Sequence, residues 1–298
     1  MLSAYCCPTN DNLPQLIVAV SSFMRQNPGV PVVAYFNKGT DVEALEAMGV
    51  EAVCVIGSHL MISGLDDLML RRPDITRAVH IGATTLTQDS LSDMAGVPMD
   101  GLPIGAASVY MFPHDEVGPD CYRQADPELF SSRQQVNERY FDTDFLLFNL
   151  EQCRRQQDRS IALRYCMSRA RTEQEFLNQV FGESDFLNMP GNLNVAPEHT
   201  IHLDLNPFKL ARHRLELENA RVIRFPGDVV PWRPIKNVDR ASIQLPMKQY
   251  LAAAECVVSL LPPEFVKTIE ANSKLLNDYI GPVADVLAEA HSIAMRNA

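Results

Sequence analysis

The sequence has few basic residues and no long apolar run. Its 298 residues include 37 Asp and Glu but only 26 Lys and Arg, which gives a net charge of −11 at pH 7. Binding of DNA, RNA or anionic lipid through bulk charge requires a basic surface, so we do not expect a nucleic-acid partner. There is no run of 18 apolar residues, and no basic segment followed by an apolar run opens the chain. We therefore expect neither a transmembrane anchor nor a signal peptide, and a cytoplasmic location.

Cysteine pairs and the common catalytic signatures are also missing. The seven cysteines are an odd number, form no C-x-x-C and lie mostly in apolar runs, which predicts reduced thiols in the core. No P-loop, G-x-G-x-x-G, G-x-S-x-G or H-E-x-x-H occurs. His199 and His202 are the one close histidine pair, and without a further ligand nearby they do not predict a zinc site.

What is present is an alternation of short apolar runs with stretches of helical spacing. This alternation predicts βαβ units, and hence an α/β fold with a mostly parallel central sheet flanked by helices. The expected early strands are Ser3–Cys7, Val30–Phe36, Ala52–Ile56 and Ala78–Ile81, and the helices between them Leu13–Gln26, Asp41–Met48 and Leu65–Leu70. Later we expect strands Phe145–Leu147 and Val222–Phe225, helices Asn149–Gln157 and Thr172–Phe181, and loops over Phe112–Pro127 and Leu187–Leu205, while Gly96–Gly105 is rich in Gly and Pro.

The end of the chain has a different pattern. Apolar positions recur at helical spacing over Met247–Val258 and Phe265–Met295, whereas all expected strands lie before residue 241. We therefore expect an α/β domain over residues 1–240 and a C-terminal helical extension over residues 241–298. Its helices are predicted to pack on the domain or in a homodimer, since their basic residues are too sparse for a polybasic membrane anchor.

Six short segments follow one another in an order that carries a resemblance. They are Thr9–Pro14 after the first strand, Arg77–Leu86, Tyr140–Leu150, Glu173–Asn178, Pro190 with Asn194, and Val222–Gly227 with Pro231 and Trp232. In this order and spacing the chain resembles glycosyltransferase family 8 over about residues 3–235. The matching family motifs are D-D-N-Y, L-D-x-D, F-N-x-G-V-L-L-I-N-L, D-Q-D-x-L-N, L-P-x-x-x-N and H-x-x-G-x-x-K-P-W.

This resemblance implies a GT-A-type domain that takes a sugar from a nucleotide-diphosphosugar, a UDP-sugar being favoured, with retention at the anomeric carbon. In an open α/β sheet the donor lies at the carboxyl ends of the strands. The residues implied to bind it are Thr9, Asn10, Asp11 and Asn12, facing base and ribose, together with Gly82, Ala83, Thr84, Asn194 and Gly227. Asn and Asp also suit turns and helix N-caps, so a purely local role for residues 9–12 stays open.

The chain departs from the family at the residues that hold Mn²⁺ there. The D-x-D positions are Gly82-Ala83-Thr84, the histidine is Arg224 and the lysine is Val230. A hard divalent cation prefers anionic oxygen ligands, so no metal cofactor is expected here. In one interpretation the guanidinium of Arg224 binds the diphosphate in place of the cation. In the other, the fold has lost catalysis and serves as a binding or scaffold module.

The segments implied to face the acceptor and the donor sugar differ as well. Asp142 and Asp144 replace the Asn and the Gly of F-N-x-G, which adds bulk and charge where the family has backbone. These two residues, with Glu175 and Trp232, are the ones we expect to recognise the acceptor or the sugar.

Three residues are predicted to be catalytic: Gln174 near the reacting face, Glu173 on the sugar hydroxyls, and Arg224 on the leaving diphosphate. Glutamine is too weak a nucleophile for easy covalent catalysis. Front-face displacement is therefore expected, with the departing phosphate accepting the proton of the acceptor. The alternative for residues 173–175 is an exposed first helical turn, where acidic side chains suit the macrodipole.

The sequence thus predicts a metal-independent, retaining glycosyltransferase whose acceptor is unidentified. One alternative is a catalytically inactive binding or scaffold protein with the same fold. The second is a glycosyltransferase that modifies nucleic-acid bases, which the net negative charge disfavours.

Overall fold

A computed structural model describes most of the chain. It covers residues 1–57, 59–108, 141–156, 161–168, 170, 172–181, 186–197, 207–226, 230–235 and 241–278. The loop expected over Phe112–Pro127 and the end of the helix expected over Phe265–Met295 lie outside these residues, as does Gly227.

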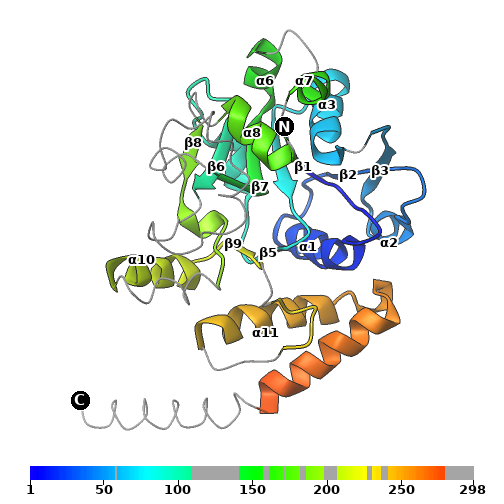
Figure 1. Cartoon of the computed structure of the whole chain (residues 1–298), viewed down its shortest axis with the longest axis vertical. Helices are drawn as coiled ribbons and strands as arrows, with labels where there is room; N and C mark the ends of the chain where they lie inside the picture. Colours follow the sequence, from blue (N-terminus) through cyan, green and yellow to red (C-terminus); the bar gives the residue numbers. More distant parts are fainter. Residues whose placement is uncertain are drawn as a thin grey trace.

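A mixed seven-stranded sheet forms the centre of the molecule, with the strand order β3-β2-β1-β4-β7-β6-β8 (Figure 1). Its strands are β1 Leu2–Cys6, β2 Val32–Phe36, β3 Glu51–Cys54, β4 Arg77–Ile81, β6 Ile104–Ser108, β7 Phe141–Asn149 and β8 Leu187–Met189. The first four are parallel, β7 runs antiparallel to both β4 and β6, and β8 is parallel to β6. The predicted α/β class with a mostly parallel sheet is confirmed.

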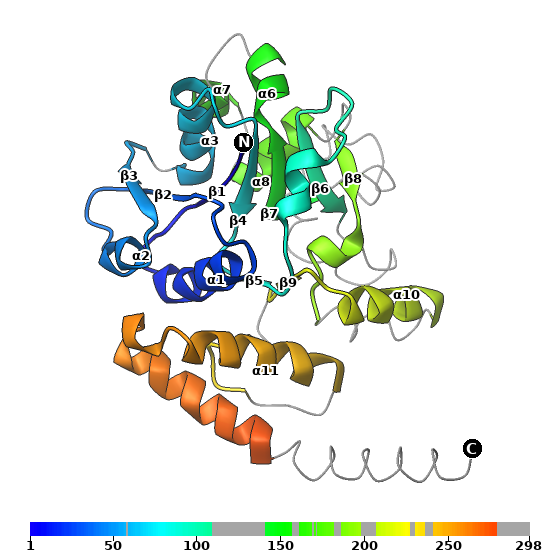
Figure 2. The ribbon, with the colours of Figure 1, turned by 180° about the vertical axis from the view of Figure 1, so that it is seen from behind.

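Helices cover both faces of the sheet, because alternate residues of a strand point to opposite sides. On β1, Ala4 and Cys6 join the apolar cluster beneath α1 (Leu13–Gln26), while Tyr5 joins the cluster beneath α3 (Leu60–Arg71). The second cluster also includes side chains of α6, α7 and α8, which span Leu150–Gln156, Ile161–Met167 and Glu173–Phe181. Figure 2 shows the same arrangement from behind.

Two helices of the C-terminal segment lie on the α1 side. They are α11 (Ala241–Glu255) and a helix over residues 263–278, drawn in orange in Figure 1. Met247, Tyr250 and Leu251 of α11 belong to the same apolar cluster as α1. A homodimer through these helices stays a prediction. Among the described helices, none is long and apolar enough to cross a lipid bilayer.

Several elements differ from the sequence expectation. The strand expected at Phe145–Leu147 is nine residues long, because β7 pairs with β4 on one side and β6 on the other. The segment expected as a loop over Leu187–Leu205 contains β8 and a 3-10 turn at Gly191–Leu193. The helix expected over Asp41–Met48 is observed as the shorter α2 (Glu43–Ala47). Neither β6 nor α10 (Pro207–Glu218) was predicted.

A small second sheet connects the end of β4 to the later part of the chain. It pairs β5 (Thr85–Thr87) antiparallel with β9 (Val222–Arg224), in a register that places Thr85 opposite Arg224. Thr85 and Arg224, which are 139 positions apart in the sequence, are therefore neighbours near the carboxyl end of β4.

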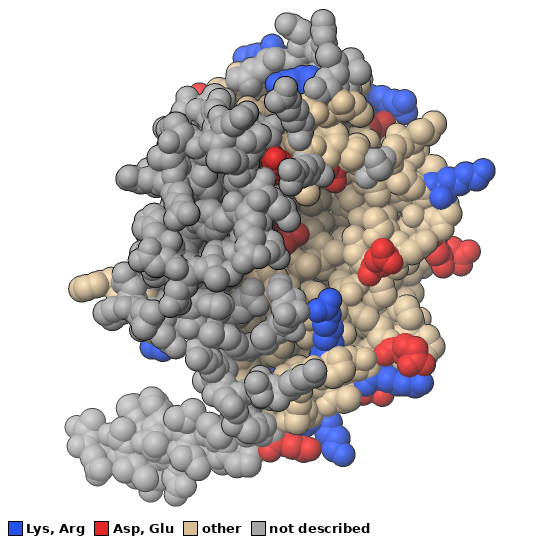
Figure 3. Space-filling model, in the orientation of Figure 1, with Lys and Arg blue, Asp and Glu red and all other residues tan. Residues whose placement is uncertain are grey.

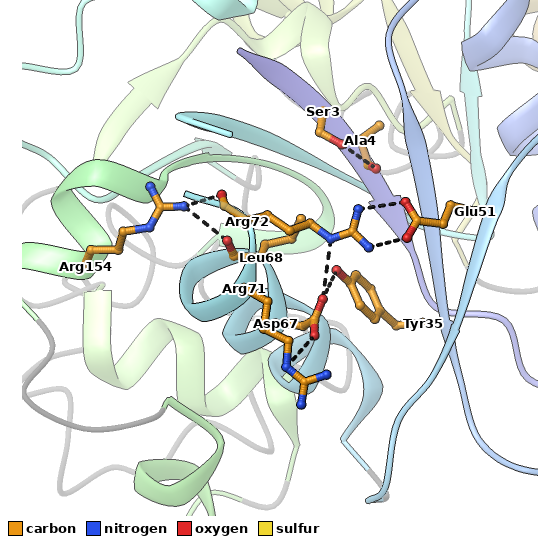
Figure 4. A network of polar contacts seen from close by, with 9 residues as sticks. All are labelled: Ser3, Ala4, Tyr35, Glu51, Asp67, Leu68, Arg71, Arg72 and Arg154. Atoms are coloured by element: carbon orange, nitrogen blue, oxygen red, sulfur yellow. Dashed lines mark hydrogen bonds and ion pairs between the residues drawn. The ribbon is translucent and has the colours of Figure 1, made fainter. Parts of the chain in front are cut away.

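Polar contacts fix α3 on the face of the sheet opposite α1 (Figure 4). The Tyr35 hydroxyl on β2 donates to Asp67 Oδ2 at 2.9 Å, and Arg72 Nη1, just after α3, lies 2.7 Å from Glu51 Oε2 on β3. Each contact joins the helix to a different strand, so α3 has one defined orientation on the sheet.

Arg154 of α6 closes the carboxyl end of α3. Its Nε donates to the carbonyl of Met69 at 2.8 Å, and its Nη2 donates to the carbonyls of Leu68, Arg72 and Ile75 at 2.8 to 3.1 Å. The last carbonyls of a helix have no hydrogen-bond partner within the helix and carry partial negative charge. The guanidinium of Arg154 donates hydrogen bonds to these carbonyls and offsets that charge.

We predict that Arg154→Ala lowers the free energy of unfolding by about 2 kcal/mol, since these carbonyls lose a charged donor. Arg155→Ala is the matched control, because Arg155 is the next residue on α6 and is exposed. Urea unfolding followed by circular dichroism measures both variants. Equal midpoints for the two would contradict the assignment.

Candidate functional site

Three segments meet where the central sheet joins the small sheet. They are Gly82–Thr84 after β4, Asp142–Asp144 at the start of β7, and Arg224 at the end of β9. The backbone N–H of Gly82 donates to the carbonyl of Asp144 at 2.7 Å, and the N–H of Phe225 donates to the carbonyl of Thr84 at 2.9 Å. The three predicted sites at the D-x-D, F-N-x-G and histidine positions thus form one cluster.

The cluster is built around a buried ion pair. Arg224 Nη1 lies 2.7 Å from Asp142 Oδ2, and the two side chains are 9% and 12% exposed. Asp142 Oδ1 accepts the backbone N–H of Asp144 at 2.8 Å, so both of its oxygens are engaged. Arg224 Nε has no hydrogen-bond partner among the described residues. The ion pair thus fixes the position of the Arg224 guanidinium, and one of its nitrogen atoms, Nε, has no partner among the described residues.

Gly82 and Asp144 fit together as one unit. A Cβ at position 82 would lie 2.5 Å from Asp144 Oδ1 and 2.8 Å from the Asp144 backbone. The other carboxylate oxygen, Oδ2, accepts a hydrogen bond from Thr84 Oγ1 at 2.6 Å. The carboxyl group of Asp144 therefore occupies the space that a side chain at position 82 would need. Gly82 stands where the family has an aspartate, and Asp144 stands where the family has a glycine. The two replacements therefore compensate each other sterically across the paired strands β4 and β7.

Burial sets the protonation behaviour of this cluster. Burial raises the pKa of Asp144 to about 6, reinforced by the negative charge of Asp142 and opposed by Arg224 and the Thr84 hydroxyl. On β4, burial lowers the pKa of His80 to about 4, so its ring is neutral at pH 7 and Nδ1 donates to the carbonyl of Thr143 at 2.8 Å. His80 carried no sequence signal beyond its place in the β4 run.

Helix α8 is fastened to the start of β7. Asn178 Oδ1 accepts the N–H of Phe141 at 2.9 Å, and its Nδ2 donates to the carbonyl of Phe141 at 2.8 Å and of Gln174 at 2.9 Å. Thr143 Oγ1 donates to Gln174 Oε1 at 3.2 Å. Gln174 therefore lies beside the segment that carries Asp142 and Asp144, and its role near the reacting face stays a prediction.

Its two acidic neighbours face elsewhere. Glu173 Oε1 accepts the backbone N–H of Ile62 at 3.0 Å, at the start of α3, and burial raises the pKa of Glu173. A carboxylate at a helix N-terminus satisfies free N–H groups there. Glu175 is buried, with its backbone N–H on Thr172 Oγ1 at 3.1 Å. Neither is the exposed first-turn residue of the alternative interpretation.

The turn after β1 is closed by its own side chains. Asn12 Oδ1 accepts the N–H of Thr9 at 2.8 Å, and Asn12 Nδ2 donates to the carbonyl of Cys7 at 3.4 Å. Asn10 and Asp11 are exposed. Because β1 is the parallel neighbour of β4, this turn lies at the same end of the sheet as Gly82. The local role is shown by these contacts, and a donor-binding role stays a prediction.

Of the remaining predicted residues, Asn194 lies beside β9 and Trp232 packs between Phe225 and α11. Asn194 precedes Val195, whose carbonyl accepts the N–H of Arg224 at 2.7 Å. Asn194 Oδ1 is buried without a hydrogen-bond partner among the described residues. Trp232 packs with its ring centroid 5.3 Å from that of Tyr250 on α11 and 6.2 Å from that of Phe225. Trp232 thus links the site segment to the C-terminal helices.

The described residues do not fit a divalent metal ion. Of the D-x-D positions, Gly82 has no side chain and Thr84 offers a neutral hydroxyl already bonded to Asp144. The Asp142 carboxylate is paired with a guanidinium, whose positive charge opposes a second cation. Within the described part of the chain, no three His, Cys, Asp or Glu residues are grouped as a metal would need.

Comparisons with known proteins place this geometry in a known fold. No family model and no curated protein matches the sequence. Among solved structures, the galactosyltransferase LgtC, crystallised with donor and acceptor sugar analogues, superimposes with a TM-score of 0.58 at 15% identity over 90% of this chain and 100% of LgtC. The apo form of the glycosyltransferase GlyE from Streptococcus pneumoniae TIGR4 gives 0.59 at 14% identity, over 87% and 62%.

The bifunctional glycosyltransferase WbbM gives a TM-score of 0.66 at 13% identity, over 91% of this chain and 51% of WbbM. The chain therefore spans about half the length of WbbM. These matches show that the fold is that of the GT-A glycosyltransferases, and LgtC is a family 8 enzyme. The predicted resemblance is confirmed at the level of the fold.

We predict that Gly82→Ala lowers the free energy of unfolding by about 2 kcal/mol, because the new methyl group overlaps Asp144. Gly96→Ala is the control, since a Cβ there meets no atom within 4 Å. In a double-mutant cycle, Asp144→Gly removes the side-chain part of the overlap, so Gly82→Ala costs less in that background. Chemical unfolding measures all four variants. Additive effects of Gly82→Ala and Asp144→Gly on the free energy of unfolding would contradict this steric coupling between the two positions.

Proposed function

We propose that the chain is a glycosyltransferase that takes a sugar from a nucleotide-diphosphosugar, a UDP-sugar being favoured, without a divalent metal. The observation that supports this most strongly is the buried cation of Arg224, held beside Gly82–Thr84 at the carboxyl end of β4. Open α/β sheets bind their ligands at this end of the strands. In fold the chain matches LgtC over nearly its whole length.

Arg224 has the chemistry to bind a diphosphate. A guanidinium remains charged, presents several N–H donors in one plane and pairs with phosphate oxygens in bidentate fashion. The bond from Nη1 to Asp142 fixes the orientation of that plane, and Nε keeps a free donor among the described residues. A cation fixed in advance stabilises the charge that develops on the leaving diphosphate at no cost in reorganisation.

The expected reaction is a front-face displacement. The bond from the anomeric carbon to the diphosphate oxygen breaks, the acceptor oxygen bonds to the same face of that carbon, and the acceptor proton passes to the departing phosphate. Gln174 lies beside Thr143 at the start of β7, close to this face. An amide oxygen there stabilises the positive charge of the forming oxocarbenium ion and is too weak a nucleophile to attack it. Asp142 acts through Arg224, while the acceptor remains unidentified.

One observation favours the inactive binding module as a second candidate. Glu173, proposed to bind sugar hydroxyls, has its Oε1 on the N–H of Ile62 instead. The nucleic-acid acceptor gains no such support. On the face drawn in Figure 3, the Lys and Arg side chains of the described residues are scattered among acidic ones and form no continuous basic patch.

We predict that the cation of Arg224 contributes about 2 kcal/mol to donor binding, equivalent to roughly 30-fold in Kd. Arg224→Gln alone strands the buried Asp142 carboxylate, which destabilises the fold. The test therefore compares Asp142→Asn with the double variant Asp142→Asn/Arg224→Gln, by calorimetric titration with UDP-galactose and UDP-glucose. Arg221→Gln is the control, because Arg221 pairs with Asp93 outside the site. Equal affinity in the two site variants would exclude Arg224 as a phosphate ligand.

We also predict that metal removal leaves turnover unchanged. Protein dialysed against EDTA is assayed for hydrolysis of, or transfer from, a panel of UDP-sugars, with and without added Mn²⁺. Equal initial rates follow if Arg224 neutralises the diphosphate. Turnover that requires Mn²⁺ would contradict the proposal, and binding without turnover under every condition would establish the inactive module.

A further inference from the structure

The site contains more negative than positive charge. Asp144 is faced by Asp142 on its own strand, by Thr84 after β4 and by Arg224 on β9. The nearby side chains from β4 and α8, His80 and Gln174, are neutral and bond to Thr143. With both carboxylates ionised, one guanidinium is the only cation among these described groups. The cluster then carries a net charge of −1.

A nucleotide-diphosphosugar brings two more negative charges to this cluster. Its phosphates would pair with N–H groups of Arg224 that Asp142 does not engage; one of these, Nε, is buried and has no partner among the described residues. Asp144 lies within contact of Gly82 and Thr84. Like charges at contact distance in a poorly hydrated site repel strongly. Either the ligand binds weakly or one carboxyl group becomes neutral. Asp142 is in direct contact with the guanidinium of Arg224, whereas the side-chain hydrogen-bond partner of Asp144 among the described residues is the neutral hydroxyl of Thr84.

We propose that Asp144 binds the donor in its protonated form, so that each nucleotide-diphosphosugar bound takes up one proton at this carboxyl group. This inference rests on the proposed function and concerns the regulation of the same site by pH. A protonated carboxyl group also gains an O–H donor, which can point to a phosphate or sugar oxygen. The proton thus does two things at once: it removes a repulsive charge and adds a hydrogen-bond donor.

Because the pKa of Asp144 is raised to about 6 in the free protein, protonating this carboxyl group near neutral pH requires little free energy. The nearby negative charges of a bound diphosphate raise that pKa further. Affinity is therefore greatest below the free-state pKa and falls as the pH rises above it. The fall is at most tenfold per pH unit, and it ends at the pKa of the complex.

The test uses the full chain with UDP-galactose and UDP-glucose. Both phosphates of these compounds are esterified, so the ligand keeps a constant charge between pH 5 and pH 8. Calorimetric titrations are made across this range, and at pH 7 in buffers that differ in ionisation enthalpy, which gives the number of protons taken up. We expect close to one proton at pH 7, and a Kd that rises by up to about tenfold per unit above pH 6.

Asp144→Asn is the decisive variant, because it is isosteric and permanently neutral. We expect it to bind about tenfold more tightly than the wild type at pH 7, with no proton uptake and no pH dependence. Asp93→Asn, an ion-paired aspartate outside the cluster, is the matched control and should behave as the wild type. The wild-type proton count stands by itself if Asp144→Asn proves unstable.

The outcomes separate this inference from the proposed function. Binding without proton uptake, at equal affinity from pH 5 to pH 8, overturns the inference and leaves the proposed function standing. No binding of either compound at any pH overturns both. Binding that requires Mn²⁺ and strengthens as the pH rises also overturns both, since it would show a cation rather than a proton at Asp144.

Discussion

The buried ion pair between Asp142 and Arg224 organises the end of the sheet on which the site is built. It joins β7 of the central sheet to β9 of the small sheet, and the second oxygen of Asp142 fixes the backbone at Asp144. Removing one partner of such a pair leaves an uncompensated buried charge, which costs far more than the pair itself contributes. The pair therefore defines how Asp144 lies over Gly82 as well as where the cation lies.

The same arrangement explains how the chain can lack the acidic metal ligands of the family it resembles and still have a positive charge at this position. The space beside residue 82 is filled by a carboxyl group from the neighbouring strand, and the positive charge comes from the protein. In the proposed function this guanidinium takes the place of the metal ion and, unlike an ion, does not dissociate from the site. On the proposed function and the inferred proton uptake, donor binding at this site depends on the proton concentration, whereas at a metal-dependent site it depends on the metal concentration.

Local pattern predicted much of the fold. The helix Leu13–Gln26 was predicted with its observed bounds, because its apolar spacing ends at a turn-forming Asn-Pro-Gly sequence. The strand β6 was not predicted, because it emerges from a segment rich in Gly and Pro and is stabilised by pairing with β7 and β8 rather than by its own pattern. Likewise the sequence shows the replacements at Gly82 and Asp144, but only the register of β4 against β7 brings them together.

The most direct test of this account is a crystal structure of the complex with a UDP-sugar, grown in the presence of manganese, with anomalous diffraction recorded at the manganese edge. The account predicts a diphosphate in contact with the Arg224 guanidinium, within hydrogen-bond reach of Asp144, and no anomalous peak between the phosphates. A manganese ion that bridges both phosphates and is ligated by Asp144 or Asp142 would contradict it.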